Sequence, residues 1–76
     1  MNRLIDLLRT TFSIDFDIDA DTPLISSGLI DSLHIVELVS MIGKEYSVSI
    51  DAQDIGTDNF DTASQIAEFV ELRKKG

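Results

Sequence analysis

The sequence has no cysteine, a single proline and no long hydrophobic run. Without cysteine there is no disulfide scaffold, no thiolate metal site and no cysteine nucleophile, so any thiol chemistry would need a group that is added to the protein. Arg3, Asp6 and Arg9 interrupt the apolar part of residues 1–12, which therefore matches neither a signal peptide nor a membrane span. The default expectation is a soluble cytoplasmic protein with no membrane partner.

Basic residues are also scarce. Lys44 is the only base between Asp15 and Asp61, a stretch with eleven acidic residues, and the formal net charge of the chain is −8. Such a surface would repel nucleic acids and attract basic protein surfaces, although the acids could equally serve only to keep a small protein soluble. With 43% hydrophobic residues the chain is too apolar for a disordered acidic tail, and its length predicts one domain over residues 1–76.

The spacing of apolar residues predicts helices over about residues 2–13, from Ser32 to about Glu45, and from near Thr62 onward. Thr62 and Gln65 have the spacing of a capping box at the start of the last helix. A short helical turn is expected after Asp51, and a few extended residues are expected over 46–50. The predicted fold is an all-α, small four-helix bundle: three main helices and one short helix, which is the third along the chain.

A long connection over residues 14–31 separates the first two predicted helices. It contains Pro23 and Gly28, and its apolar residues are numerous enough to pack against the core. Loops of this length without secondary structure are uncommon and often functional. Its alternating aspartates, from Asp15 to Asp21, are similar to the start of a calcium loop, but neither register supplies the glycine and the closing glutamate that an EF-hand needs.

The stretch GLIDSLHIVEL, residues 28–38, places Ser32 where this connection becomes a helix. Gly28 can close the preceding turn, and both Asp31 and Ser32 are good helix N-caps. His34 invites a pairing with Ser32 as nucleophile and base, yet helix geometry places the two side chains about 200° apart. Intrinsic catalysis is therefore not expected, and His34 is expected to face solvent.

The second predicted helix has two apolar faces. Ile35, Leu38 and Ile42 group on the side expected to face the core. The opposite side, next to Ser32, carries Leu33, Val36, Glu37 and Ser40. Exposed apolar residues bordered by charge are typical of protein docking sites, but the long connection could also cover them, or they could be scattered and without function.

GLIDSL followed by VEL resembles the attachment motif of the acyl and peptidyl carrier proteins, in which a glycine precedes Asp-Ser-Leu at the start of the second helix. The likeness extends over nearly the whole chain through its length, charge and order of helices. It implies that Ser32 carries 4′-phosphopantetheine, transferred from coenzyme A by a separate phosphopantetheinyl transferase. The terminal thiol would hold acyl or aminoacyl groups as thioesters and present them to other enzymes.

The resemblance also implies that Asp31, Leu33, Val36, Glu37 and Ser40 face the transferase, a loading ligase or transferase, and downstream biosynthetic enzymes. The protein would be a monomeric carrier and not itself an enzyme, with no catalytic residue, no metal and no nucleic-acid partner.

Carriers of primary fatty-acid synthesis often have an acidic residue at the position of His34, a methionine at that of Ser40, and several glutamates further on. We therefore expect a free-standing carrier of a specialised polyketide, nonribosomal-peptide or aminoacyl-transfer pathway. The alternatives are a fatty-acid-synthesis carrier and an unmodified acidic helical adaptor.

Overall fold

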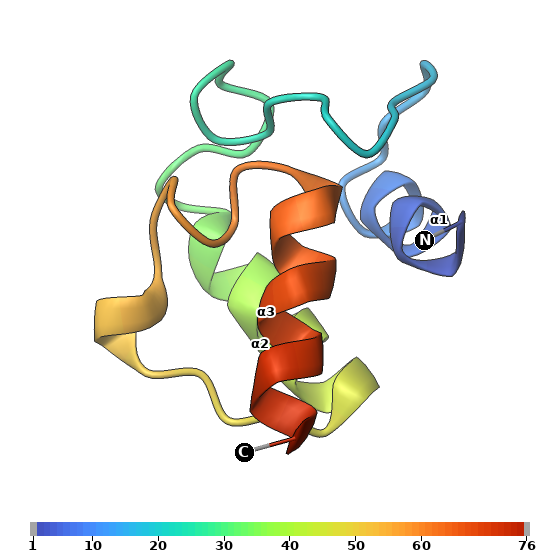
Figure 1. Ribbon diagram of the computed structural model, residues 1–76. Helices are drawn as coiled ribbons and strands as arrows, with labels where there is room; N and C mark the ends of the chain where they lie inside the picture. Colours follow the sequence, from blue (N-terminus) through green and yellow to red (C-terminus); the bar gives the residue numbers. More distant parts are fainter. Residues whose placement is uncertain (1, 76) are drawn as a thin grey trace.

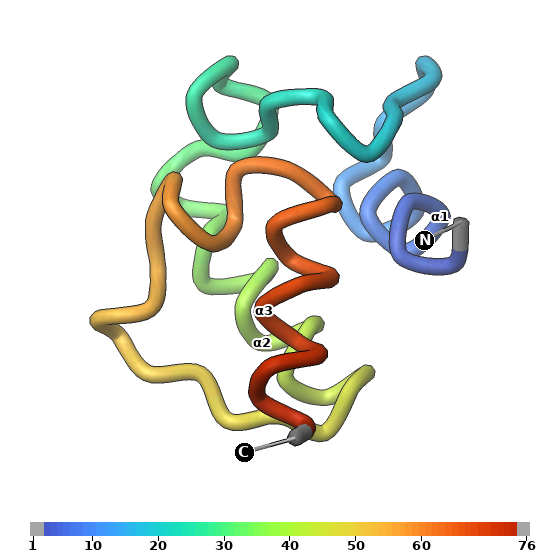
Figure 2. Tube along the Cα trace, in the orientation of Figure 1, coloured from blue at the N-terminus to red at the C-terminus, as the bar shows by residue number. Residues whose placement is uncertain are grey.

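The computed structural model describes residues 2–75 and contains three α-helices: α1 (Asn2–Thr11), α2 (Ile35–Tyr46) and α3 (Ala63–Lys75). A single 3₁₀ turn, η1 (Ala52–Asp54), lies between α2 and α3 (Figure 1). Residues 2–75 contain no β-strand, so the predicted all-α fold is confirmed, with the short third helix reduced to one turn. The connection between α1 and α2 passes over one end of the helices, as the tube in Figure 2 shows.

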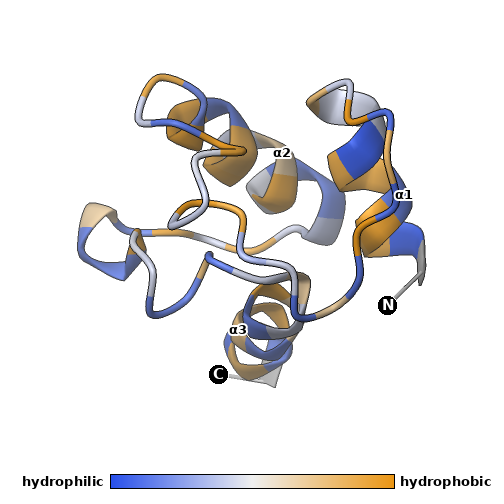
Figure 3. Cartoon of the chain, turned by 90° about the horizontal axis from the view of Figure 1, so that it is seen from above, coloured by the Kyte–Doolittle hydropathy of each residue, from blue (hydrophilic) through white to orange (hydrophobic). Residues whose placement is uncertain are grey.

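The hydrophobic core is shared by the helices and by the long connection. Seen from above, the three helices surround a common interior, and hydrophobic and hydrophilic residues alternate along each of them (Figure 3). The connection contributes four buried side chains, which confirms that it packs against the core. Leu24 and Ile30, near its end, are almost completely excluded from solvent. The core consists of Leu4, Leu8, Ile14, Ile18, Leu24, Ile30, Leu38, Ile42, Phe60, Ala63, Ile66, Phe69 and Val70.

Two helix boundaries differ from the predictions. α1 ends at Thr11, because Ser13 adopts a left-handed conformation with φ of 54°. α2 begins at Ile35 and not at Ser32, since residues 31–34 form a turn in which the N–H of His34 donates to the carbonyl of Asp31 at 3.0 Å. Helix periodicity cannot distinguish such a turn from the first turn of the helix.

At its other end α2 includes Tyr46, which was expected among the extended residues. Ser47 then takes a left-handed conformation with φ of 54° that ends the helix, and residues 48–50 form neither helix nor strand.

The start of α3 forms the predicted capping box. The N–H of Gln65 donates to the Thr62 hydroxyl at 3.1 Å, and the Gln65 side-chain oxygen accepts the N–H of Thr62 at 3.3 Å. Further along α3, Arg73 pairs with the carboxylate of Asp54 at 2.7 Å and lies 4.9 Å from the centre of the Phe69 ring. These contacts attach the η1 turn to α3. Each helix within residues 2–75 is too short or too polar to span a membrane.

Candidate modification site and partner surface

Ser32 lies in the turn that leads into α2, and its side chain is exposed. Among residues 2–75 its hydroxyl has no hydrogen-bond partner. It stands next to the N-terminal end of α2, where the helix dipole favours a negatively charged group such as a phosphate. The hydroxyl is therefore open to a modifying enzyme without the loss of any internal hydrogen bond.

Asp31, and not Ser32, caps the turn. Its Oδ1 atom accepts the backbone N–H groups of Leu33 and His34, both at 3.1 Å. The carboxylate also lies 2.8 Å from Nδ1 of His34. These contacts lower the pKa of Asp31, and the backbone N–H of His34 makes the largest contribution. Of the two predicted caps, the structure uses one and leaves the serine free.

His34 is exposed, as expected, but it precedes α2 instead of lying within it. Its ring contacts the Asp31 carboxylate and makes an edge-to-face contact with Phe12, which directly follows α1; the ring centres are 6.1 Å apart. The structure therefore engages His34 with these two residues and not with Ser32 as a general base would require.

The predicted second apolar face is confirmed. Leu33 and Val36 are 83% and 72% exposed, whereas Leu38 and Ile42 on the other side of α2 are fully buried. The long connection does not cover Leu33 and Val36. Exposed apolar side chains grouped in this way are characteristic of a docking surface.

A shallow groove runs along this face, between α1 and α2. Sequence reasoning identified four of the residues that line it and missed the other three, Thr11, Met41 and Lys44. Thr11 belongs to a different helix, and nothing in its local sequence indicates that it borders this face. We call this the α2 groove; its lining residues are Thr11, Leu33, Val36, Glu37, Ser40, Met41 and Lys44.

A residue that contacts the connection leading to Ser32 was not identified from the sequence. Asp61, just before α3, accepts hydrogen bonds from the backbone N–H groups of Ile25 and Ser26, both at 2.8 Å, and from the Ser26 hydroxyl at 2.8 Å. The Ser26 backbone N–H makes the largest contribution to lowering the pKa of Asp61. Through these bonds, Asp61 attaches the connection that leads to Ser32 to the start of α3.

The acidic connection is not arranged as a metal site. The Asp19 carboxylate accepts the N–H of Asp21 at 2.9 Å and the hydroxyl of Thr22 at 3.0 Å, which closes a local turn and lowers the pKa of Asp19, chiefly through Asp21. Within residues 2–75 no group of three or more acidic or histidine side chains is placed to hold a metal ion.

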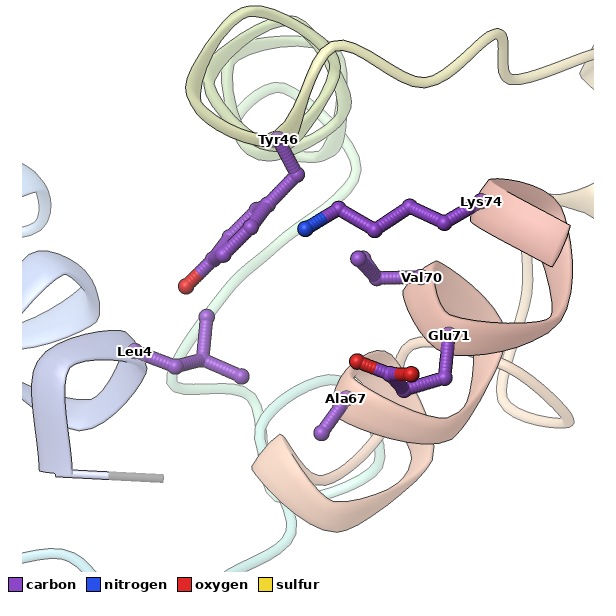
Figure 4. A pocket seen from close by; sticks show the side chains of 6 residues that line it. All are labelled: Leu4, Tyr46, Ala67, Val70, Glu71 and Lys74. Atoms are coloured by element: carbon purple, nitrogen blue, oxygen red, sulfur yellow. The ribbon is translucent and has the colours of Figure 1, made fainter.

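A cavity of about 160 Å³ lies far from the serine, where the end of α2 approaches α1 and α3. In Figure 4 the Lys74 ammonium points toward Tyr46, whose ring centre is 5.8 Å away. α2 has twelve residues and is about 18 Å long, so the cavity is separated from Ser32 by roughly the length of the helix. Leu4, Tyr46, Ala67, Val70, Glu71 and Lys74 line it.

The fold and the site together define a class of protein. A three-helix bundle displays one exposed hydroxyl at the entrance of its central helix, beside an exposed apolar face and a groove. An exposed hydroxyl beside an exposed apolar face is the arrangement expected of a small protein that presents an attached group to other proteins.

Comparison with known proteins identifies the family. Residues 2–70 match the family described as "Phosphopantetheine attachment site", so the chain belongs to this family of carrier proteins and carries 4′-phosphopantetheine as its covalent cofactor. It is 30% identical over 71 residues to the D-alanyl carrier proteins of Streptococcus sanguinis (strain SK36) and Streptococcus gordonii (strain Challis), covering 92% of this chain and 90% of each relative.

A solved structure, described as "Crystal structure of FAD-dependent dehydrogenase", contains a chain that matches this fold with a TM-score of 0.71 and 29% identity. The match covers 95% of this chain and 99% of that chain, so the matched chain is about the size of this carrier.

Proposed function

We propose that Ser32 is the attachment point of the phosphopantetheine arm and that residues 1–76 act as a single carrier domain. The observation that carries the proposal is the exposed Ser32 hydroxyl, which has no hydrogen-bond partner within residues 2–75 and stands at the dipole-positive end of α2. The residues fit the group: a phosphodiester there would extend into solvent, and the cap made by Asp31 would remain in place.

The modification is a phosphoryl transfer onto the serine. The Ser32 oxygen attacks the pantetheine-bearing phosphorus of coenzyme A, a new P–O bond forms, the pyrophosphate P–O bond breaks, and 3′,5′-ADP leaves. The hydroxyl proton passes to a base of the transferase, because within this chain His34 is engaged by Asp31 and Phe12. The arm supplies the thiol that the cysteine-free chain lacks and holds the cargo as a thioester.

We infer that the cargo is an aminoacyl group. Two observations support this. Relatives at 30% identity are D-alanyl carrier proteins. The chain also has His34 just before α2 and Ser40 within it, where fatty-acid-synthesis carriers often have an acidic residue and a methionine. A carrier of primary fatty-acid synthesis is the second candidate.

The partner surface consists of Asp31, Leu33, Val36, Glu37 and Ser40, extended by the α2 groove. Its partners are the phosphopantetheinyl transferase, an amino-acid-activating ligase and downstream enzymes. Each partner would supply apolar side chains for Leu33 and Val36 and basic residues to complement a chain whose net charge is −8. Docking through so small a surface stays weak, which allows partners to exchange.

The carrier acts as a monomer in the cytoplasm, where coenzyme A and these enzymes are present, and catalyses no step itself. The carrier-sized chain in the structure described as an FAD-dependent dehydrogenase supports a flavin-dependent dehydrogenase as one class of downstream partner.

The decisive experiment combines intact-protein mass with loading assays. The protein is incubated with coenzyme A and a broad-specificity phosphopantetheinyl transferase, and we expect its mass to increase by one phosphopantetheine. An unchanged mass of the folded protein would support the unmodified adaptor instead. The modified protein is then offered amino acids with an activating ligase and, separately, malonyl-coenzyme A with a malonyl transferase. Malonyl loading without aminoacyl loading would overturn the aminoacyl assignment in favour of fatty-acid synthesis.

A further inference from the structure

Asp61 connects the start of α3 with the segment that leads to Ser32. Its carboxylate accepts three hydrogen bonds from Ile25 and Ser26, and its carbonyl accepts the N–H of Leu24. Asp61 is 35 residues away from Ser26 in the chain. A single residue thus satisfies four donors of one short turn. Hydrogen bonds to an ionised carboxylate are about twice as strong as those between neutral groups.

The turn that Asp61 holds continues directly to the serine. The Leu24 carbonyl accepts the N–H of Ile30 at 2.8 Å, and the Ile25 carbonyl accepts the N–H of Gly28 at 3.1 Å. Gly28 has φ of +86°, a conformation that L side chains rarely adopt, and it allows the segment to fold back on itself. Ile30 is fully buried and precedes Ser32 by two residues.

The other side of Asp61 is fixed by the cap of α3. Its backbone N–H donates to the side-chain oxygen of Gln65 at 2.9 Å, and the neighbouring Phe60 is fully buried. The backbone of Asp61 is therefore attached to a regular helix, while its carboxylate holds an irregular loop. A loop with no helix or strand of its own depends on such contacts for a defined position.

We propose that Asp61 is a positioning residue for the modification of Ser32, because it keeps residues 24–30 closed and thereby holds the Ser32 turn in the position that the transferase recognises. The proposal rests on the attachment of the arm at Ser32. Asp61 does not touch the reacting atoms. Without its charge, the closed loop is populated for a smaller fraction of the time, and apparent affinity falls in proportion to that fraction.

The test uses Asp61→Asn, which retains one side-chain oxygen but loses the charge and the second acceptor. We expect faster amide hydrogen exchange at residues 24–26 and 30, with exchange in α1 unchanged. For the transferase acting on this carrier, we expect kcat/KM to fall about 5- to 10-fold while kcat stays within about twofold. Asp58→Asn removes the same charge from an exposed position nearby and should leave both measurements at wild-type values.

Ser26→Ala provides a second variant in case Asp61→Asn folds poorly, because it removes only the bond from the Ser26 hydroxyl. We expect a smaller change in the same direction for both readouts. Wild-type kcat/KM in a variant whose loop exchanges faster would overturn the proposal, and so would unchanged exchange. Failure of the wild-type protein itself to accept the arm would instead overturn the attachment at Ser32.

Discussion

Asp31 and Ser32, neighbours in the turn before α2, differ in their contacts: Asp31 accepts hydrogen bonds within the turn, and the Ser32 side chain is exposed. The Asp31 carboxylate accepts the N–H groups of Leu33 and His34, so the turn is held without any contribution from the side chain of Ser32. The Ser32 hydroxyl takes no part in these contacts, so we expect that its loss or esterification leaves the fold unchanged. At this scale, the side chain that stabilises the turn, Asp31, differs from the side chain proposed to carry the arm, Ser32.

The first prediction follows from this division. Ser32→Ala should abolish the mass increase after incubation with coenzyme A and transferase, and it should change the free energy of unfolding by less than about 0.5 kcal/mol, as is usual for surface positions without special contacts. Intact mass and urea unfolding measure the two effects. Ser64→Ala, exposed on α3, serves as the control and should still be modified. Modification of Ser32→Ala at another residue would contradict the assignment.

The first turn of α3 helps to hold another segment in place. The Thr62–Gln65 capping box satisfies backbone N–H groups that a helix start leaves without partners, and the same Gln65 oxygen holds Asp61. Substitutions at this cap should therefore reduce the stability of both the helix and the connection to Ser32.

Thr62→Ala removes the hydroxyl that accepts the Gln65 N–H, and we expect a loss of about 1 kcal/mol in the free energy of unfolding, the usual cost of losing an N-cap side chain. Urea unfolding monitored by circular dichroism measures it. Thr57→Ala, at an exposed position outside the helices, should have a much smaller effect. Equal losses in the two variants would mean that the cap contributes nothing.

The interaction of Asp61 with the connection predicts a pH dependence of stability. Hydrogen bonds from Ser26 and Ile25 lower the pKa of Asp61 below its ordinary value of 3.8. A group whose pKa is lower in the folded state adds stability above its unfolded pKa and loses it as the pH falls through the folded pKa. The stability advantage of the wild type over Asp61→Asn should therefore be constant from pH 7 to pH 5 and decline below about pH 3.8.

Urea unfolding of both proteins between pH 7 and pH 2 measures this difference, and Asp58→Asn controls for the change in net charge. An advantage that grows toward acid pH would show that the Asp61 carboxylate is not stabilised by these bonds.

At the scale of the whole molecule, one core is assembled from three short helices and a long irregular connection. Leu24 and Ile30 of that connection are as buried as Leu8 of α1 and Ile66 of α3. Next to this core, near the end of α2, the partly open cavity in Figure 4 lies between α1, α2 and α3. A chain of 76 residues has little stability to spare, so filling such a space should be measurable.

Ala67→Leu should fill part of this cavity, because Ala67 lies on α3 facing Leu4 and leucine is nearly as good a helix former as alanine. We expect a gain of about 1 kcal/mol in the free energy of unfolding. Ala52→Leu, at an exposed position in η1, adds the same atoms outside the cavity and should give no comparable gain. A loss of stability in Ala67→Leu would indicate that the space cannot accept the side chain without strain.

The sequence by itself determined the helical class of the fold, the capping box of α3, the two faces of α2 and the serine motif. Each of these features depends on residues only a few positions apart in the chain, so helix periodicity and capping patterns are enough to predict it. Tertiary structure alone decided that α2 starts at Ile35, that Thr11 borders the α2 groove, and that Asp61 holds the turn before Ser32. The groove and the contacts of Asp61 depend on segments brought together from distant parts of the chain. The start of α2 depends on which of several possible partners each polar group of the turn over residues 31–34 finds, and helix periodicity does not specify this.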